Sequence, residues 1–249
     1  MLLVADIGNT NITAGIFDDS RLLKTFRLHS DITISEDEYL SLIVSNTKDF
    51  DITSAVIGSV VEGLDEKIKL CMDKAFGIKT VMLDSNSKIG MKICTERPEL
   101  VGMDRIANIS GAKEYPNPKI IIDFGTATTF DITDGDGNFY GGIILPGVNT
   151  QLQSLHSQTS KLPLIEPKMV KEVIAHDTKG CILSGVIKGH ACAVDGLITE
   201  CEKELGQKAA VICTGGLSSL ISEHMQRKID RINPNLTLEG LRNLYLLNR

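Results

Sequence analysis

Blocks of apolar and polar residues alternate along the first third of the chain, and their spacing predicts strands and helices in a definite order. Short apolar runs bounded by turn residues predict strands, and apolar positions at helical spacing predict helices. A capping box formed by Ser35 and Glu38 begins the first helix, and Gly77 ends the second. The predicted order is strand, strand, strand, helix, strand, helix, strand, over residues 1–5, 12–17, 21–28, 35–48, 53–61, 64–76 and 80–83.

A polar turn separates the first two predicted strands. It runs from Asp6 to Asn11, and Gly8 within it allows the backbone to approach a bulky anion closely. Amides and hydroxyls between Gly8 and Asn11 are therefore candidates for contact with phosphate oxygens. Asp6, at the end of the strand, is a candidate ligand for magnesium or its waters. An ordinary hairpin, in which Asn and Gly serve only the turn, explains this stretch equally well on its own.

The same unit occurs again about half the chain later. Residues 119–130 contain an apolar run and an Asp-x-Gly-x-x-x-Thr turn that starts at Asp123, and a return strand begins at Phe130. Repetition at this scale predicts two related domains, each presenting an acidic glycine turn to a shared cleft. Two such turns facing each other suit both ends of a nucleoside triphosphate, so the duplication favours a phosphate site over a plain hairpin.

A break between the two halves is predicted at residues 115–118, where Tyr-Pro-Asn-Pro follows a helix that Asp104 opens. We therefore expect an N-terminal domain of residues 1–116 and a C-terminal domain of residues 117–249. In the second half, a long helical stretch at residues 178–205 contains Gly185, Gly189 and Gly196, which indicates close packing or a break in the helix.

The composition is that of an ordinary folded protein: 42% of the 249 residues are hydrophobic and 23% are charged. The net charge of −6 argues against a general nucleic-acid surface. No apolar run approaches the roughly 20 residues of a membrane span, and residues 1–5 are too short for a signal peptide. The six cysteines show no C-x-x-C and no zinc spacing, so we expect mostly buried, reduced thiols in a cytoplasmic protein. The five histidines form no metal-binding pair and are expected at the surface.

The sequence contains no G-x-x-x-x-G-K-[ST], so a P-loop is not the phosphate site. The two acidic turns offer a different cradle of backbone amides and short polar side chains, and Asp6 and Asp123 supply charge for cations. The candidate ATP-binding residues are Asp6, Ile7, Gly8, Asn9, Thr10, Asn11, Ile12, Thr13, Gly125, Thr126 and Thr128.

Asp104 is the candidate general base. It lies at a predicted helix start, and the helix N-terminus and the neighbouring Arg105 would both favour its ionised form, in which a base must begin. A plain helix cap is the alternative, since Asp is common there. A cap would not require the preceding Gly102 or the adjacent arginine.

The paired turns look like the two phosphate motifs of the acetate kinase, sugar kinase, Hsp70 and actin superfamily. Within it, three further stretches resemble the type III pantothenate kinases: Gly102-Met103-Asp104-Arg105, residues 141–147 (GGIILPG) and Thr214-Gly215-Gly216. The similarity covers essentially the whole chain. It implies an α/β fold of two related ribonuclease H-like domains of the βββαβα type, with the active site in the cleft between them.

This resemblance implies ATP-dependent phosphorylation of pantothenate to 4'-phosphopantothenate, the first step of coenzyme A biosynthesis, with magnesium. It makes Asp104 the acceptor of the substrate proton, Arg105 a partner for the pantothenate carboxylate, and Asp123 the ligand of a monovalent cation, K+ or NH4+. It also implies a homodimer, for which the glycine-spaced helix at 178–205 is the expected contact. The pantothenate-binding residues that it implies are Thr95, Gly102, Met103, Asp104, Arg105 and Thr178.

The chain departs from the family's pattern near the substrate. Thr95 stands where the family commonly has Tyr, and Thr178 is explained equally well as a helix cap. Two other functions therefore stay open. One is a non-enzymatic regulator with the same fold, because some relatives are known as transcription accessory factors, although the intact Asp6, Asp104 and Asp123 argue against it. The other is a kinase of another small hydroxy acid or a sugar, which the change at Thr95 keeps open.

Overall fold

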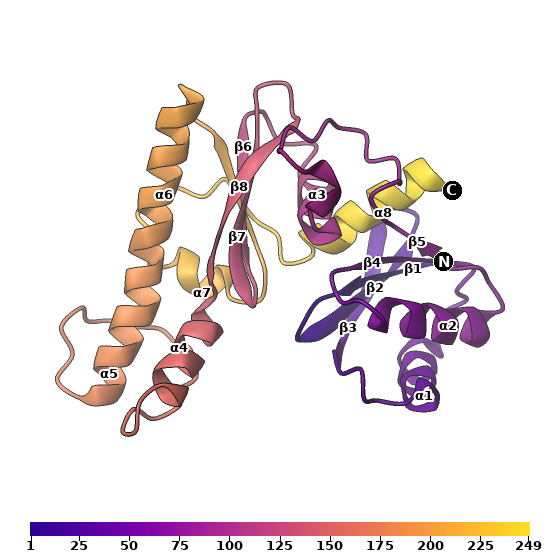
Figure 1. Cartoon of the computed structure of the whole chain (residues 1–249), viewed down its shortest axis with the longest axis horizontal. Coiled ribbons are helices and arrows are strands. Elements are labelled where there is room, and N and C mark those ends of the chain that lie inside the picture. Colours follow the sequence, from indigo (N-terminus) through magenta and orange to yellow (C-terminus); the bar gives the residue numbers. More distant parts are fainter. The chain divides into compact units, whose positions relative to one another are not determined.

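The computed structural model describes all 249 residues, which form two compact units (Figure 1). Unit 1 comprises residues 1–112 together with 236–249, and unit 2 comprises residues 113–235. Each unit contains one five-stranded sheet. The first boundary, between Ala112 and Lys113, lies within a few residues of the predicted break.

The sheet of unit 1 has the strand order β3-β2-β1-β4-β5. The three N-terminal strands form an antiparallel meander, and β4 pairs in parallel with β1. The predicted strands and helices of this unit are present. The elements are β1 (Leu2–Ile7), β2 (Asn11–Asp18), β3 (Arg21–His29), α1 (Glu36–Thr47), β4 (Ser54–Ser59), α2 (Leu64–Phe76), β5 (Val81–Met82), a short 3-10 turn (Pro98–Leu100), α3 (Met103–Gly111) and α8 (Leu236–Asn248).

Side chains of β1 alternate between two hydrophobic clusters, as the two-residue period of a strand requires. Leu3, Ala5 and Ile7 pack in one cluster with buried residues of α1 and α2, whereas Leu2 and Val4 pack in the other with residues of α3 and α8. The two helix pairs accordingly lie on opposite faces of the sheet (Figure 1). The sheet is covered on both sides, which explains why β1 and β4 are almost wholly apolar.

The C-terminal helix α8 belongs to unit 1, so the predicted C-terminal domain of 117–249 differs from the structure at its end. Leu238, Leu241 and Leu244 of α8 pack in the second cluster of unit 1. A Cβ at Gly240 would overlap the backbone of Ala107 in α3, so the two helices cross at a position that only glycine fits.

Unit 2 repeats the topology of unit 1. Its sheet order, β10-β9-β6-β7-β8, has the same arrangement of an antiparallel meander joined in parallel to a fourth strand. The prediction of two related α/β domains is thus confirmed. The elements are β6 (Lys119–Phe124), β7 (Ala127–Thr133), β8 (Phe139–Pro146), α4 (Val148–Ser157), α5 (Thr178–Leu183), a π-helical turn (Ser184–Lys188), α6 (Gly189–Leu205), β9 (Ala210–Thr214), α7 (Ser218–Ser222) and β10 (Arg231–Ile232).

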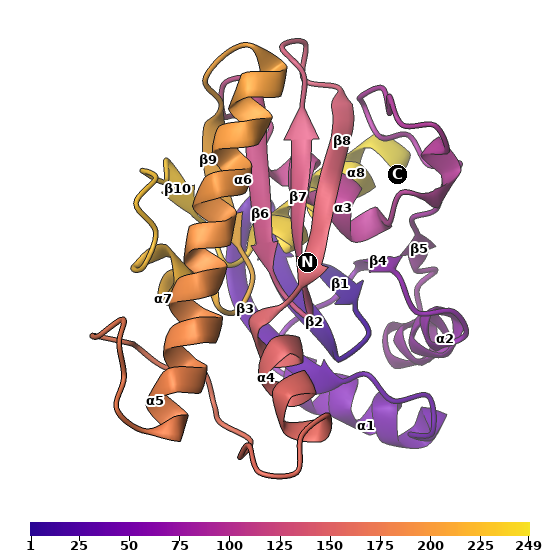
Figure 2. The same ribbon diagram turned by 60° about the vertical axis from the view of Figure 1, so that its left-hand side comes forward.

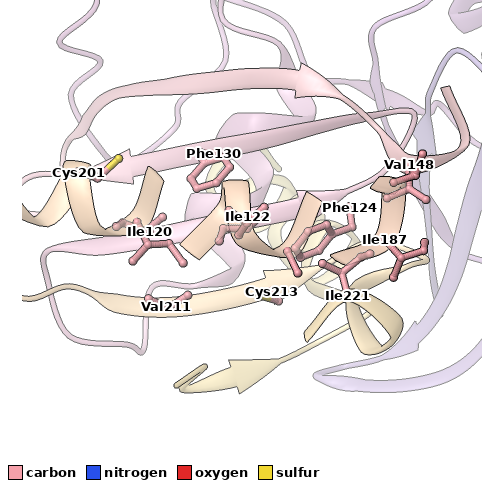
Figure 3. Packing of buried hydrophobic residues seen from close by; sticks show 14 of the residues in the cluster. Ile120, Ile122, Phe124, Phe130, Val148, Ile187, Cys201, Val211, Cys213 and Ile221 are labelled. Carbon is pink, nitrogen blue, oxygen red and sulfur yellow. The ribbon is translucent and has the colours of Figure 1, made fainter. Parts of the chain in front are cut away.

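The predicted long helix at 178–205 is continuous but changes its winding at the π-helical turn. One face of it packs on the sheet through Ile187, Val194 and Ile198, within the core cluster of unit 2 (Figures 2 and 3). This is the one helix long and apolar enough to cross a membrane by length and composition, and 50% of its apolar window is buried inside the structure. The core of the unit therefore explains the buried half of this window.

Two expectations about individual side chains are wrong. All six cysteines are free, but Cys94, Cys181 and Cys192 are exposed. His190 is buried at 4% exposure and is hydrogen-bonded within unit 2, although a surface position was expected. His190 is buried because its partners, such as Thr128, lie far away in the sequence.

Candidate active site

The first acidic turn connects β1 to β2 and is held by its own backbone. The Gly8 amide donates to Asn11 O at 3.1 Å, and Ser30 Oγ donates to Gly8 O at 2.6 Å. The Gly8 N–H is thus used inside the turn, and the contact of Gly8 with phosphate stays a prediction. Asn9, Thr10 and Asn11 are exposed. These three residues form the exposed rim of the first turn.

Asp6 stands directly opposite Thr13 in the pairing of β1 with β2, and both side chains are partly exposed. Directly opposed residues point to the same face of a sheet, so this carboxylate and hydroxyl are neighbours. Ile7 and Ile12 form the next pair, and their side chains are fully buried in the core. Only the backbone of these two isoleucines is available to a ligand.

The second turn, between β6 and β7, is one residue shorter than the first. Asp123 pairs with Thr129, whereas Asp6 pairs with Thr13. The Gly125 amide donates to Ala127 O at 3.1 Å, so it too is used within its turn. Gly125 and Thr126 are exposed. The two turns therefore share a plan in which the glycine amide closes the loop and the polar residues face outward.

The Gly147 corner supports the second turn from behind. The amide of Gly147 donates to Thr126 O at 3.1 Å, and Thr150 Oγ1 donates to the same oxygen at 2.7 Å. A Cβ at Gly147 would overlap the carbonyl oxygens of Gly125 and Thr126. Glycine is thus required where the corner meets the turn.

Thr128 does not lie on the surface of this turn, contrary to its prediction as an ATP contact. Its side chain is fully buried, and Thr128 Oγ1 lies 3.0 Å from His190 Nε2. A nucleotide cannot reach this hydroxyl without disturbing the core. The role of Thr128 is therefore structural, beneath the turn.

Asp123 lies against the Thr214-Gly215-Gly216 loop after β9. Gly215 has φ +89°, and a Cβ there would overlap Asp123 Oδ1 and lie 2.6 Å from Phe124 N. A left-handed glycine without a side chain therefore leaves the space that the Asp123 carboxylate occupies. The position of Asp123 in β6 and its parallel pairing with Thr214 bring these motifs together.

Asp104 is the second residue of α3 and is not its cap, because Gly102 holds the N-cap position and no side chain caps the helix. Asp104 Oδ1 accepts a hydrogen bond from Arg105 N at 2.8 Å. Loss of hydration through burial raises the pKa of Asp104 and outweighs the opposing effects of the Arg105 amide and guanidinium. Arg105 thus favours the ionised form, as expected, but its effect on the pKa is smaller than that of burial. A raised pKa makes the carboxylate a stronger proton acceptor once it is ionised.

Val60, which the sequence reasoning missed, connects the first turn to the Asp104 loop. Its amide donates to Ile7 O at 3.1 Å, and its side chain would lie 3.4 Å from a Cβ at Gly102. The first turn and Asp104 therefore lie at the same edge of the unit 1 sheet, where β1 and β4 end. Ligands of parallel sheets typically bind at this carboxyl edge.

The remaining predicted substrate residues lie in different surroundings. Met103 is buried and Arg105 partly buried, in the first turn of α3. Thr95 Oγ1 is buried and has no hydrogen-bond partner. Thr178 is exposed as the first residue of α5, and Asp177 is the cap because its side chain accepts from Gly180 N at 3.0 Å. The alternative of Thr178 as a cap is therefore wrong.

Comparison with known proteins identifies the family. The family model described as type III pantothenate kinase matches residues 2–200. The chain belongs to the type III pantothenate kinase family. Two curated relatives carry the same name: one from an Exiguobacterium species is 37% identical over the whole of both chains, and one from Desulfosudis oleivorans is 40% identical over 97% of each.

Solved structures with low sequence identity to this type III pantothenate kinase family member have the same fold. A Campylobacter jejuni protein assigned to the Baf family of transcriptional activators superposes with a TM-score of 0.63 at 20% identity, over 98% of this chain and 97% of that one. A ROK family glucokinase from Streptomyces griseus, solved with glucose and AMPPNP, superposes with a TM-score of 0.50 at 13% identity over 98% of both chains. The actin-like two-domain architecture is thus shared with sugar kinases.

Asp6 and Asp123 are placed so that each could supply one carboxylate to a cation, with the nucleotide phosphates supplying further ligands. No group of three or more His, Cys, Asp or Glu side chains is gathered to hold a metal ion. Magnesium in nucleotide sites typically takes one or two carboxylates and completes its shell with phosphates and water. Asp6 beside the first turn and Asp123 beside the second each offer one partly exposed carboxylate of this kind.

Proposed function

We propose that this chain transfers the γ-phosphoryl group of ATP to the terminal hydroxyl of pantothenate, producing 4'-phosphopantothenate for coenzyme A biosynthesis. The observation that carries this proposal is the identity of 37–40% over essentially full length to relatives named type III pantothenate kinase. The placement of Asp104 and the first turn at one edge of the unit 1 sheet supports it, since phosphoryl transfer needs an acceptor hydroxyl beside a phosphate cradle.

In this proposal Asp104 takes the proton of the substrate hydroxyl as the hydroxyl attacks phosphorus. The absent side chain of Gly102 gives the carboxylate its space, and Arg105 pairs with the pantothenate carboxylate through its planar fork. Met103 contributes backbone only, because its side chain is buried. Thr95 and Thr178 are the remaining proposed pantothenate contacts. The Thr95 hydroxyl, buried without a partner, is suited to a polar ligand atom.

For ATP, we assign phosphate contacts to the exposed rim at Asn9–Asn11 and to Thr13, Gly125 and Thr126. Asp6 would hold magnesium and Asp123 a monovalent cation, K+ or NH4+. When bound, these cations neutralise charge on the triphosphate.

The same proposal includes a homodimer in the cytoplasm, with no nucleic-acid partner. The exposed face of the long helix carries Gly185, Gly189 and Gly196, and a Cβ at each would meet nothing within 4 Å. Such a face allows a second helix to approach closely. Six free cysteines are consistent with a reducing compartment.

The test is ADP release in potassium buffer with pantothenate present and absent. Pantothenate-dependent ADP release is expected. A panel of small hydroxy acids and sugars decides the second function: faster turnover of one of these would replace pantothenate as the substrate. ATP binding without turnover of any of them would instead favour a regulatory protein.

A further inference from the structure

We infer that His190 is a positioning residue for the second turn, Gly125–Ala127, and that it acts as a neutral ring with its proton on Nε2. The inference rests on the proposed function, because it assumes that this turn contacts ATP. His190 lies in the first turn of α6, directly after the π-helical segment, and none of the motifs of the sequence includes it.

Three contacts of His190 bracket the second turn. Nε2 lies 3.0 Å from Oγ1 of Thr128, the residue that follows the turn. The ring meets the ring of Phe124, the residue before the turn, edge-on, with centroids 6.1 Å apart and an interplanar angle of 65°. Edge-on pairs of this geometry are favourable. One side chain thus contacts both residues between which the exposed turn is suspended.

The third contact runs through Gln151 of α4. Gln151 Nε2 lies 2.9 Å from His190 Nδ1 and donates to Pro146 O at 2.9 Å. Pro146 pairs with Ala127 in the register of β7 and β8. His190 therefore ties the turn to the strand beside it as well as to the residues at its two ends.

The hydrogen-bond partners of the ring determine which of its two nitrogens carries the proton. The amide nitrogen of Gln151 carries two N–H donors and accepts nothing, and the contact with Pro146 O requires that it be the nitrogen that faces this carbonyl. His190 Nδ1 must accept the second donor, so a neutral ring carries its proton on Nε2 and donates to Thr128 Oγ1. Burial lowers the pKa of His190, which favours this neutral form.

Loss of the His190 ring should weaken the binding of ATP more than that of pantothenate. Without the ring, the buried Thr128 Oγ1 would lose its partner and the partly exposed Gln151 amide would lose an acceptor, and the hairpin could shift to hydrate the Thr128 hydroxyl. The exposed Gly125 and Thr126 would then lose their fixed positions. A site misplaced by about 1 Å can lose a large part of its activity.

His190→Phe is the first test, because Phe keeps the ring beside Phe124 and removes both hydrogen bonds. ATP affinity, measured by calorimetry, is expected to fall roughly tenfold or more, because the turn loses two hydrogen bonds that hold it in place. The KM for pantothenate should change less than about threefold, within the scatter of an uninvolved contact. His190→Gln, which keeps a donor and an acceptor, should recover most of the ATP affinity. The control is His156→Phe on α4, since His156 is exposed and its ring lies beside Leu162 O.

Thr128→Val tests the same contact from the other side if His190→Phe does not fold. It should also weaken ATP binding. The double variant should bind ATP no more weakly than the worse of the two single variants, because both substitutions remove the same contact between His190 and Thr128. A folded His190→Phe or Thr128→Val protein with native ATP affinity would overturn the inference. So would an equal loss for ATP and pantothenate, which indicates general damage to the fold.

Nitrogen-detected NMR of the histidine rings gives a readout that does not depend on turnover. His190 should show a protonated Nε2 and a bare Nδ1 in the wild-type protein. Protonation on Nδ1 would contradict the hydrogen-bond assignment even in an active enzyme. If wild-type protein shows the expected ring but binds ATP without phosphorylating pantothenate, the proposed function fails while the positioning of the nucleotide turn stands.

Discussion

The missing side chain of Gly102 makes room for the carboxylate of Asp104: a Cβ at position 102 would overlap Asp104 Oδ1. The two residues are only two positions apart, and the bend between them begins α3. Gly102 is therefore needed for the placement of Asp104 and does not need a positive φ. An ordinary turn glycine is required for its backbone conformation, whereas Gly102 is required for the space that its missing side chain leaves.

Gly102→Ala should reduce kcat by roughly tenfold or more, because the added methyl group must displace the proposed base. Stability should change little, since an alanine is tolerated at this backbone conformation. Gly141→Ala is the matched control: a Cβ there would meet nothing within 4 Å. Steady-state rates and thermal melts of both variants check the expectation. Equal rates for the two variants would show that Gly102 doesn't position Asp104.

Asp104→Asn should lower turnover by roughly 10²–10⁴-fold if Asp104 is the base, because an amide cannot accept the substrate proton. The loss could fall at the low end, since phosphoryl transfer often has a loose transition state in which proton removal comes late. ATP affinity should stay near the wild-type value. Asp6→Asn is the contrasting variant, which should weaken the productive magnesium–ATP complex instead. A folded Asp104→Asn protein with near-native turnover would remove the base assignment.

The same substitution should leave the protein as stable as the wild type, or more so, at neutral pH. Burial raises the pKa of Asp104, so the ionised carboxylate is less favourable in the folded chain than in the unfolded one. That penalty is fully present above the raised pKa of the folded state and absent below the ordinary aspartate pKa of about 4. Chemical denaturation at several pH values should therefore show the advantage of Asp104→Asn shrinking as the pH falls. An advantage that grows in acid would contradict the raised pKa.

The pH dependence of turnover reports the same group. A base must be ionised in the free enzyme, so kcat/KM for pantothenate should fall as the pH drops through the pKa of Asp104. Because burial raises that pKa, the acid limb should lie above about 4. A profile of kcat/KM measured over the stable range checks this, and the residual activity of Asp104→Asn should lack the limb. An identical limb in the variant would assign the titration to another group.

The two acidic turns could be predicted because their signals are local. Asp6 and Asp123 stand out through a repeated pattern of strand, acidic glycine turn and strand, and both turns occur where the pattern predicts them. Local sequence failed where burial decides the outcome. Arg105 beside Asp104 predicts a lowered pKa, whereas the structure gives a raised one because packing removes water from the carboxylate.

Distant contacts were also beyond the sequence. His190 gave no signal as a lone histidine on a helix, since its partners Thr128 and Gln151 lie 62 and 39 residues away. Similarly, Leu238 and Leu241 show that one face of α8 is buried, but the pattern does not say against which sheet. The close approach of Gly240 to the backbone of Ala107 in α3 places α8 against the sheet of unit 1, and this contact is not visible in the pattern of α8 alone.

Asp123→Asn should abolish the proposed preference for potassium over sodium without preventing folding. In the wild type, potassium or ammonium should support much faster turnover than sodium, because a cation at Asp123 offsets triphosphate charge. ATP-dependent thermal shifts in the two salts give a second readout, since a cation bound with ATP stabilises the folded chain by mass action. The wild type should show a larger shift in potassium, and Asp123→Asn should show equal shifts. Equal rates and equal shifts in the wild type would remove the monovalent site.

Gly196→Ala separates the two explanations of the glycine face on α6. Gly196 is exposed in the middle of the helix, and a Cβ there would meet nothing within 4 Å of the chain itself. If this face is only solvated, alanine should stabilise the helix by about 0.5–1 kcal/mol and leave the association state unchanged. If a second copy packs closely against it, the added methyl group should weaken the dimer while the helix itself gains stability. Light scattering across a dilution series, together with thermal melts, distinguishes these outcomes. A wild-type monomer at micromolar concentration would remove the dimer from the proposal.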